Sequence, residues 1–235
     1  MPGNNLLKNL VNNIIPKEII RNNLVKVGIQ SQIPAGMGLK SSSAVSSATA
    51  LACYGLIGND LDDETILNSA IHASLDAGVT ITGAYDDSTA CYFGGIVVTN
   101  NYRFELVHRE EAPADLLVVL FLPALKRRGK ICNLYAFSDL FVEAFNLAKA
   151  RHYWKAMKLN GLLTSSALCC SYEPVLEIIQ RGALGASVSG NGPSIAAVTY
   201  KEHVDDIKQI FERYDGATLV SRINNEKASV KVIVG

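Results

Sequence analysis

Residues Pro34–Ala44, with the sequence PAGMGLKSSSA, combine two glycines, a lysine and three consecutive serines. They separate an expected strand, Leu24–Ser31, from an expected helix of small residues over Ser41–Ile57. The free amides and the positive dipole end of a helix start attract an anion, and glycine lets the backbone approach a phosphate. These residue types indicate a phosphate-binding loop, although a serine-capped helix with nothing bound is an alternative explanation.

The loop differs from two common phosphate-binding loops. A Walker A loop has glycine immediately before its lysine, whereas Leu39 precedes Lys40 here. A dinucleotide-binding fingerprint has a third glycine, which does not follow Gly36 and Gly38. Lys40 either reaches the phosphates or points into solvent. The candidate nucleotide-binding residues of the loop are Pro34, Ala35, Gly36, Met37, Gly38, Leu39, Lys40, Ser41, Ser42, Ser43 and Ala44.

Asp86 and Asp87 are the candidate catalytic side chains, and we expect them in a glycine-flanked loop within Val79–Gly95. Transfer of a phosphoryl group needs a carboxylate that orients or deprotonates the acceptor hydroxyl, and Mg²⁺ that neutralises phosphate charge. A turn or a helix cap is the alternative role for this pair, because aspartate is common in both.

The segment Ser187–Ser194, SVSGNGPS, is a second glycine-containing loop between expected strands Ala186–Ser189 and Ile195–Tyr200. It is not the nucleophile elbow of a serine hydrolase, because the pattern G-x-S-x-G is absent. A hairpin turn is the simpler explanation of the two glycines when the segment is taken alone.

The elements that must position these residues predict an α+β protein in two layers. We expect two domains, over residues 1–112 and 113–235, with the boundary near Glu111–Asp115. The other expected helices are Leu6–Ile15, Glu18–Asn22, Glu64–Asp76, Leu134–Asn160, Gly161–Cys170, Val175–Gln180 and His203–Tyr214. The other expected strands are Ile96–Thr99 and Arg103–Val107, joined as a hairpin over Asn100-Asn101, then Asp115–Leu122, Ala217–Arg222 and Ser229–Val234.

The composition argues against several classes of function. The formal net charge of the 235 residues is zero and the pI is about 6.9, so we expect no nucleic-acid partner. The longest apolar run, Leu116–Leu122, is too short to cross a bilayer, and we expect neither a membrane span nor a secretory leader. The five cysteines include no Cys-x-x-Cys pair and the four histidines no metal-ligand spacing. We therefore expect reduced thiols in a cytoplasmic protein.

Both glycine loops resemble motifs of the GHMP kinases, the family of galactokinase, homoserine kinase, mevalonate kinase and phosphomevalonate kinase. The family's phosphate loop has a proline, three variable residues, Gly-Leu, a small residue and Ser-Ser-Ala or similar, and Lys40 stands here at the small residue. Ser187–Ser194 resembles the third motif, a glycine loop that packs beside the phosphate loop. The resemblance implies a fold with an N-terminal part like ribosomal protein S5 domain 2 and a ferredoxin-like C-terminal part. It also implies ATP and Mg²⁺ as cofactors.

The same resemblance implies roles for individual residues. The family's catalytic aspartate precedes a Gly-Gly pair by a fixed distance, and counting back from Gly94-Gly95 gives Asp87, with Asp86 as the alternate. Eleven residues before Asp87, Asp76 matches the acidic Mg²⁺ ligand, usually glutamate, and Ser42 is its expected partner. Asp76 is otherwise an ordinary exposed residue at a helix end. The nucleotide contacts implied in the third motif are Ser189, Gly190 and Gly192.

Within this family, Gly83–Asp87 following Val79–Thr82, together with Gly38–Ala44, resembles the archaeal-type shikimate kinases. This resemblance implies ATP-dependent phosphorylation of the 3-hydroxyl of shikimate, in the biosynthesis of chorismate and the aromatic amino acids. The shikimate carboxylate should meet a cation, and the nearest basic residues, which a solvated turn also explains, are Lys126, Arg127, Arg128 and Lys130. The alternatives are a GHMP kinase for another small alcohol, such as homoserine or mevalonate, and a non-catalytic ATP-binding remnant.

GHMP kinases begin with strands that carry a first motif, whereas this chain begins at the helix expected after those strands. We therefore expect the first strands of the fold to be missing. A fragment, a misassigned start and completion by another polypeptide are the three explanations. Exposed sheet edges favour association, so a homo-oligomer is a further expectation.

Overall fold

The computed structural model of the chain describes residues 2–58, 62–80, 83–124, 131–168 and 173–233. The chain forms two compact units: the first comprises Met1–Ala35, Lys40–Glu111 and Asn224–Gly235, and the second Gly36–Leu39 and Ala112–Ile223. The phosphate loop is therefore shared, since its glycines belong to the second unit and its serines to the first. A single division at residue 112 does not describe this arrangement, because both the loop and the C-terminal tail depart from it.

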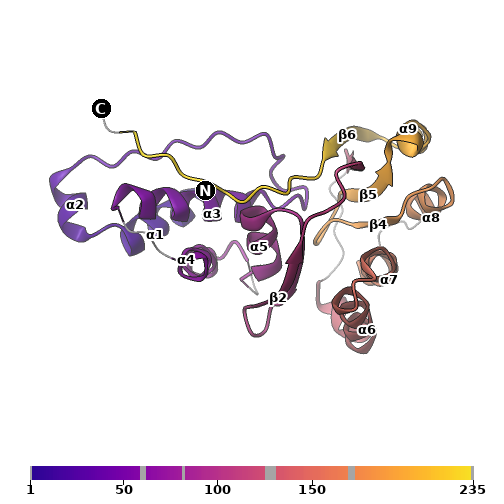
Figure 1. Cartoon of the computed structure of the whole chain (residues 1–235), viewed down its shortest axis with the longest axis horizontal. Helices are drawn as coiled ribbons and strands as arrows, with labels where there is room; N and C mark the ends of the chain where they lie inside the picture. Colours follow the sequence, from indigo (N-terminus) through magenta and orange to yellow (C-terminus); the bar gives the residue numbers. More distant parts are fainter. Residues whose placement is uncertain (1, 59–61, 81–82, 125–130, 169–172, 234–235) are drawn as a thin grey trace. The chain divides into compact units, whose positions relative to one another are not determined.

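The first unit consists of packed helices and one β-hairpin (Figure 1). The described elements are α1 Pro2–Ile14, α2 Lys17–Asn22, α3 Ser41–Leu56, α4 Asp63–Asp76, α5 Tyr85–Phe93, β1 Ile96–Asn100 and β2 Glu105–Glu110. The apolar side chains of α1 recur at helical spacing, which buries Leu6 and Leu10 against α3 and α4. Cys53, Leu67 and Tyr92 complete this core. The predicted helices of this region and the predicted hairpin are confirmed.

The strand predicted at Leu24–Ser31 is wrong, because the chain there is extended but unpaired. In Figure 1 it is a plain trace between α2 and α3. No backbone hydrogen bond joins residues 24–32 to another described residue. A strand forms only where a neighbouring strand satisfies its N–H and C=O groups. The segment instead borders a cavity of about 570 Å³ against α3, lined in part by Val25 and Val45, and it leaves Leu24 and Ile29 exposed.

The closing strand predicted at Ser229–Val234 is wrong for the same reason, since its described residues belong to no sheet. The tail before this segment is nevertheless anchored to the first unit. The Asn224 carbonyl accepts a hydrogen bond from the Gly95 N–H at 2.7 Å, and the Tyr92 carbonyl accepts one from the Ala228 N–H at 2.7 Å. These two contacts fix the tail across the end of α5 and the start of the hairpin.

The second unit is built on an antiparallel sheet with the strand order β4-β5-β3-β6. Figure 1 labels β4, β5 and β6 of this sheet. Its described elements are β3 Leu116–Pro123, η1 Ile131–Phe137, α6 Ser138–Lys149, α7 Tyr153–Ala167, α8 Glu173–Gln180, β4 Gly185–Val188, β5 Ile195–Tyr200, η2 Lys201–His203, α9 Val204–Phe211 and β6 Gly216–Arg222. The continuous apolar run of β3 is explained by its central position, where Val119 pairs with Ala197 on one side and Val220 on the other. This order of strands and helices is the ferredoxin-like arrangement that the resemblance to the GHMP kinases implies.

Helices α8 and α9 contribute the core of the second unit. Phe211 stacks on Phe121 of the sheet, with ring centroids 5.0 Å apart. Ile178, Ile207 and Val119 are fully buried around this pair. The strong apolar stripe of α9 is therefore buried on the sheet, as its helical spacing requires.

The helix predicted over Leu134–Asn160 is wrong in its extent. The chain breaks between α6 and α7, where Arg151 adopts a left-handed φ of 63°. Helix α7 then continues through Gly161, at which a new helix was predicted. A Cβ atom at Gly161 would lie 2.7 Å from the Ala186 carbonyl oxygen, so this glycine allows α7 to pack closely on β4.

Candidate active site

The start of α3 carries the serines of the phosphate loop and a set of open backbone donors. Among the described residues, the N–H groups of Ser41, Ser42 and Ser43 find no acceptor, whereas the Ala44 N–H donates to the Lys40 carbonyl at 3.0 Å. The first turn contains no acidic side chain, and no side chain caps it. Because the first amides of a helix carry the positive end of its dipole, this terminus is suited to an anion such as phosphate.

The two aspartates lie in the first turn of α5 and not in the loop that the sequence predicted. The helix begins directly after Ala84, whose φ of 48° is left-handed. Aspartate is favoured here because its charge interacts with the positive end of the helix dipole. Successive residues of a helix point in different directions, so Asp86 is exposed and Asp87 is half-buried.

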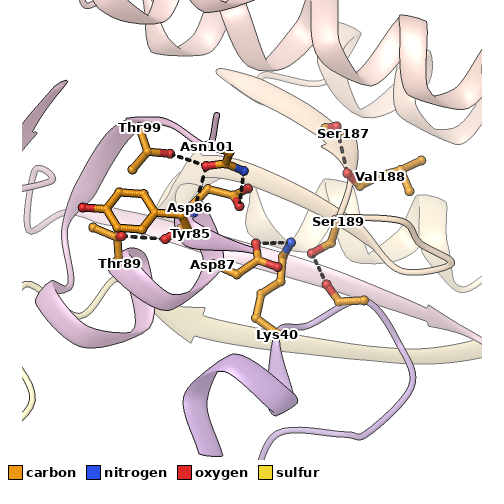
Figure 2. Close-up of polar contacts among 11 residues, drawn as sticks. Lys40, Tyr85, Asp86, Asp87, Thr89, Thr99, Asn101, Ser187, Val188 and Ser189 are labelled. Atoms are coloured by element: carbon orange, nitrogen blue, oxygen red, sulfur yellow. Dashed lines mark hydrogen bonds and ion pairs between the residues drawn. The ribbon is translucent and has the colours of Figure 1, made fainter. Parts of the chain in front are cut away.

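Asp86 is held by the hairpin that follows α5. The Asn101 side-chain amide donates from Nδ2 to Asp86 Oδ1 at 2.7 Å and accepts at Oδ1 from the Asp86 N–H at 3.1 Å (Figure 2). Thr99 Oγ1 donates to the same Asn101 oxygen at 3.0 Å, which fixes the amide. Sequence reasoning placed Asn101 only in a turn, and its contact with Asp86 was missed.

Asp87 forms an ion pair with Lys40, the residue before α3 (Figure 2). The two side chains are 19% and 29% exposed, so water reaches this pair only in part. Burial raises the pKa of the Asp87 carboxyl above its usual value, the Asp86 charge raises it further, and Lys40 opposes both effects. A carboxylate with a raised pKa beside an anion-binding helix start is a candidate general base.

Cys91 lies one turn after Asp87 on the same helix. Burial, followed by the charge of Asp87, raises the pKa of its thiol to about 11. The thiol is therefore neutral at physiological pH and is unsuited to act as a nucleophile.

Ser42 and Asp76, the predicted Mg²⁺ ligands, both have exposed side chains in the first unit. Asp76 is the last residue of α4, which packs on α3, and its carboxylate has no partner among the described residues. Mg²⁺ needs only one or two protein oxygens beside phosphates and waters, so a free hydroxyl and a free carboxylate fit it. The described part of the chain contains no cluster of three His, Cys, Asp or Glu side chains that could bind a metal without such help.

In the second unit, the glycine part of the phosphate loop packs against the loop at Ser187–Ser194. Ser189 Oγ donates to the Gly38 carbonyl at 2.9 Å (Figure 2). Gly38 has a φ of 78°, and a Cβ atom there would lie 2.8 Å from the Gly192 carbonyl oxygen. Glycine is therefore required at residue 38 by both backbone conformation and close approach.

The other predicted nucleotide-binding residues differ in exposure. Met37 is buried, and its carbonyl accepts a hydrogen bond from the Ser194 N–H at 3.3 Å. Gly190 is exposed, whereas Gly192 is buried. The remaining ones are exposed or half-buried: Pro34, Ala35, Gly36, Gly38, Leu39 and Ala44.

Two further predictions concern the cation that meets the acceptor carboxylate and the absence of a membrane span. The basic residues predicted to meet the acceptor carboxylate, Lys126, Arg127, Arg128 and Lys130, lie outside the described residues. Across the part of the chain that the structure describes, no helix has the length and apolar character needed to span a bilayer.

Comparison with known proteins identifies related sequences. The family model of the GHMP kinases N terminal domain matches residues 5–95. A shikimate kinase of Methanobrevibacter smithii is 35% identical over 204 residues, which are 83% of this chain and 70% of the relative. A shikimate kinase of Methanosarcina acetivorans is 40% identical over 203 residues, which are 84% of this chain and 68% of the relative.

A solved structure shows the same fold. Homoserine kinase from Cytophaga hutchinsonii resembles the chain with a TM-score of 0.68, covering 96% of this chain and 78% of that one. The two sequences are 20% identical, so the likeness concerns the fold alone. It confirms the α+β fold class predicted from the sequence.

Proposed function

The chain belongs to the GHMP kinase family, and on this premise we propose that it is a shikimate kinase. The reaction transfers the γ-phosphoryl group of ATP to the 3-hydroxyl of shikimate. The observation that carries the proposal is the identity of 35% and 40% to shikimate kinases over more than four fifths of the chain. The 20% identity to a homoserine kinase supports a common fold and does not favour homoserine as the acceptor.

Asp87 is the proposed general base. The acceptor hydroxyl loses its proton as its oxygen bonds to the γ-phosphorus, while the bond from that phosphorus to the bridging oxygen of ATP breaks and ADP leaves. Asp87 accepts this proton, and its raised pKa brings its basicity closer to that of an effective proton acceptor at neutral pH. Asp86 is the weaker candidate, because Asn101 already occupies one of its oxygens.

The phosphates of ATP are assigned to the phosphate loop, where the N–H groups of Ser41, Ser42 and Ser43 have no acceptor among the described residues. Ser189, Gly190 and Gly192 are proposed as further nucleotide contacts. Ser42 and Asp76 are proposed to hold Mg²⁺ together with the phosphates. The ion, when bound, neutralises phosphate charge and orients the transferred group.

Competition between acceptors tests the substrate assignment. The purified chain is incubated with ATP and Mg²⁺ and with shikimate, homoserine or mevalonate in turn, and ADP and the phosphorylated product are quantified. We expect phosphorylation of shikimate above the other two alcohols. Phosphorylation of homoserine or mevalonate without shikimate would overturn the assignment.

A binding measurement separates a kinase from a non-catalytic remnant. Calorimetric titration with ATP and Mg²⁺ is made on the same preparation as the activity assay. We expect both binding and turnover. A chain that binds ATP and phosphorylates none of the three acceptors would be a nucleotide-binding protein and not a kinase.

A further inference from the structure

Lys40 carries a long charged side chain at a backbone position suited to glycine. Its φ is 65° and its ψ is 22°, in the left-handed region that residues with a Cβ atom rarely adopt. Gly36 and Gly38 in the same loop also have positive φ values, of 74° and 78°. Glycine at residue 40 would satisfy the backbone without strain. A lysine in this strained conformation points to a role for its side chain.

The side chain of Lys40 meets one carboxylate, that of Asp87. The titratable groups that face Asp87 are Lys40 at the start of α3 and two groups of α5, Asp86 and Cys91. Cys91 is neutral at physiological pH and Asp86 is negative, so Lys40 supplies the positive charge among these groups. The ion pair also joins the starts of two helices, each of which follows a non-glycine residue of positive φ.

Asn101 makes this pairing selective. It binds the side chain and the N–H of Asp86, the neighbour of Asp87, with distances of 2.7 Å and 3.1 Å. Asp86 is thereby directed toward the hairpin, and it forms no ion pair with Lys40. The two adjacent carboxylates thus have different partners, an amide for Asp86 and an ammonium for Asp87.

We propose that Lys40 is a positioning residue for phosphoryl transfer, which holds the Asp87 carboxylate ionised and oriented to accept the proton of the acceptor hydroxyl. The inference rests on the proposed function in that Asp87 is the general base. It explains why lysine stands at a position that the backbone would leave to glycine. It also assigns to Lys40 a role that does not require direct contact with nucleotide phosphate.

The direct test is a titration of the Asp87 carboxyl by NMR in the substrate-free protein, with aspartate labelled at the carboxyl carbon and the Asp87 signal assigned by its loss in Asp87→Asn. In Lys40→Met we expect the pKa of Asp87 to rise, because the opposing positive charge is lost while burial and Asp86 remain. Lys208→Met is the matched control, since Lys208 pairs with Asp205 at 3.7 Å on the exposed side of α9. It should leave the Asp87 titration unchanged.

Activity measurements connect this coupling to the reaction. Lys40→Gly should lower kcat by about 10- to 100-fold, the range expected when a reacting group loses its orientation, with little change in the KM for shikimate. Its thermal midpoint should stay close to that of the parent, because the relief of backbone strain by glycine offsets the loss of the ion pair with Asp87. The acid limb of the kcat profile should move to higher pH. Lys40→Arg keeps the charge and should retain most of the parent activity and the parent acid limb.

The outcomes separate this inference from the proposed function. An unchanged Asp87 titration in Lys40→Met would overturn the role of Lys40, whatever the acceptor is. A Lys40→Gly variant with the parent kcat would do the same. If Asp87→Asn instead retains the parent kcat, the assignment of the base fails, and the role of Lys40 in the reaction falls with it.

Discussion

The two parts of the phosphate loop are held by different kinds of contact. Residues Gly36–Leu39 are fixed through the backbone, since the Gly38 carbonyl binds Ser189 and a side chain at residue 38 would strike the Gly192 carbonyl. The part that begins at Lys40 is fixed through charge, by the ion pair with Asp87. The first part contains no ionisable side chain, whereas the second contains a lysine and three hydroxyls.

This difference indicates that the backbone conformation of the loop and the charge interactions next to it depend on different residues. Changes in the glycine part should alter folding and nucleotide binding together, because the same backbone contacts serve both. Changes at the ion pair should alter the rate and its pH dependence while the fold persists.

The largest effect should come from the base itself. Asp87→Asn keeps the size and one hydrogen-bond acceptor of the side chain but cannot take up a proton, so kcat should fall by about 10²–10⁴-fold. Asp86→Asn is the matched control, because an asparagine can still accept the hydrogen bond from Asn101. Steady-state rates with shikimate check both variants. Equal losses in the two variants would show that the carboxylates are not distinguished as proposed.

Gly38→Ala should affect binding and stability together. Positive φ alone costs about 1–3 kcal/mol for alanine, and the contact with the Gly192 carbonyl displaces the loop. We expect kcat/KM for ATP to fall by about 10²-fold. Gly36→Ala is the control, since residue 36 has a similar φ of 74° but nothing within 4 Å of a Cβ atom. If both variants lose the same activity, backbone strain and not the packed loop is responsible.

The pH dependence should report the raised pKa of Asp87. Burial and the Asp86 charge raise that pKa, so the proton-accepting form and the rate should appear at a higher pH than for an ordinary aspartate. The folded protein also binds this proton more tightly than the unfolded chain. The contribution of Asp87 to the free energy of unfolding therefore falls as pH rises from the ordinary value through the raised one.

Both statements are checked by measuring kcat/KM and the free energy of unfolding as functions of pH, for the parent and for Asp87→Asn. The asparagine variant should lose the acid limb, and its stability relative to the parent should increase with pH across that window. An acid limb at the pH of an exposed aspartate would contradict the assignment.

Ser189→Ala should have the smallest effect. Removing its hydrogen bond to the Gly38 carbonyl costs about 1 kcal/mol, because water can replace the lost donor at this half-buried site. That corresponds to roughly a fivefold change in an equilibrium constant, which is measurable in the Kd for ATP. Ser221→Ala is the control, since Ser221 Oγ donates to the adjacent Arg222 carbonyl at the surface. A larger loss in the control would exclude a specific role for Ser189.

Local sequence patterns were sufficient for most helices and for the central sheet. In α1 the helical spacing of apolar residues, and in β3 the apolar run, are sufficient to predict a buried element from the residues of that segment alone. Helix α5 was missed because its buried side chains include Ser88 and Thr89 between two tyrosines, so no apolar period marks it. The order and spacing of the glycine motifs predicted the family, which the related sequences confirm.

Contacts between distant residues could not be predicted in the same way. The segment Leu24–Ser31 has the apolar content of a strand, but a strand also needs a partner that its own residues do not specify. The contact of Asn101 with Asp86 depends on how the hairpin folds back over 15 residues. The sequence alone does not decide whether Lys40 reaches phosphate or solvent, because its pairing with Asp87 arises only once two helix starts meet.

The most direct test of the account is an amide NMR titration of the labelled protein with Mg²⁺ and a non-hydrolysable ATP analogue. Phosphate at the start of α3 should shift the amide signals of Gly38–Ala44 most strongly, together with that of Asp87. The contrary result is a protein that is saturated with the analogue, shows its largest shifts elsewhere, and leaves the signals of this loop and of Asp87 unmoved. That result would contradict phosphate binding at the loop and the kinase site built on it.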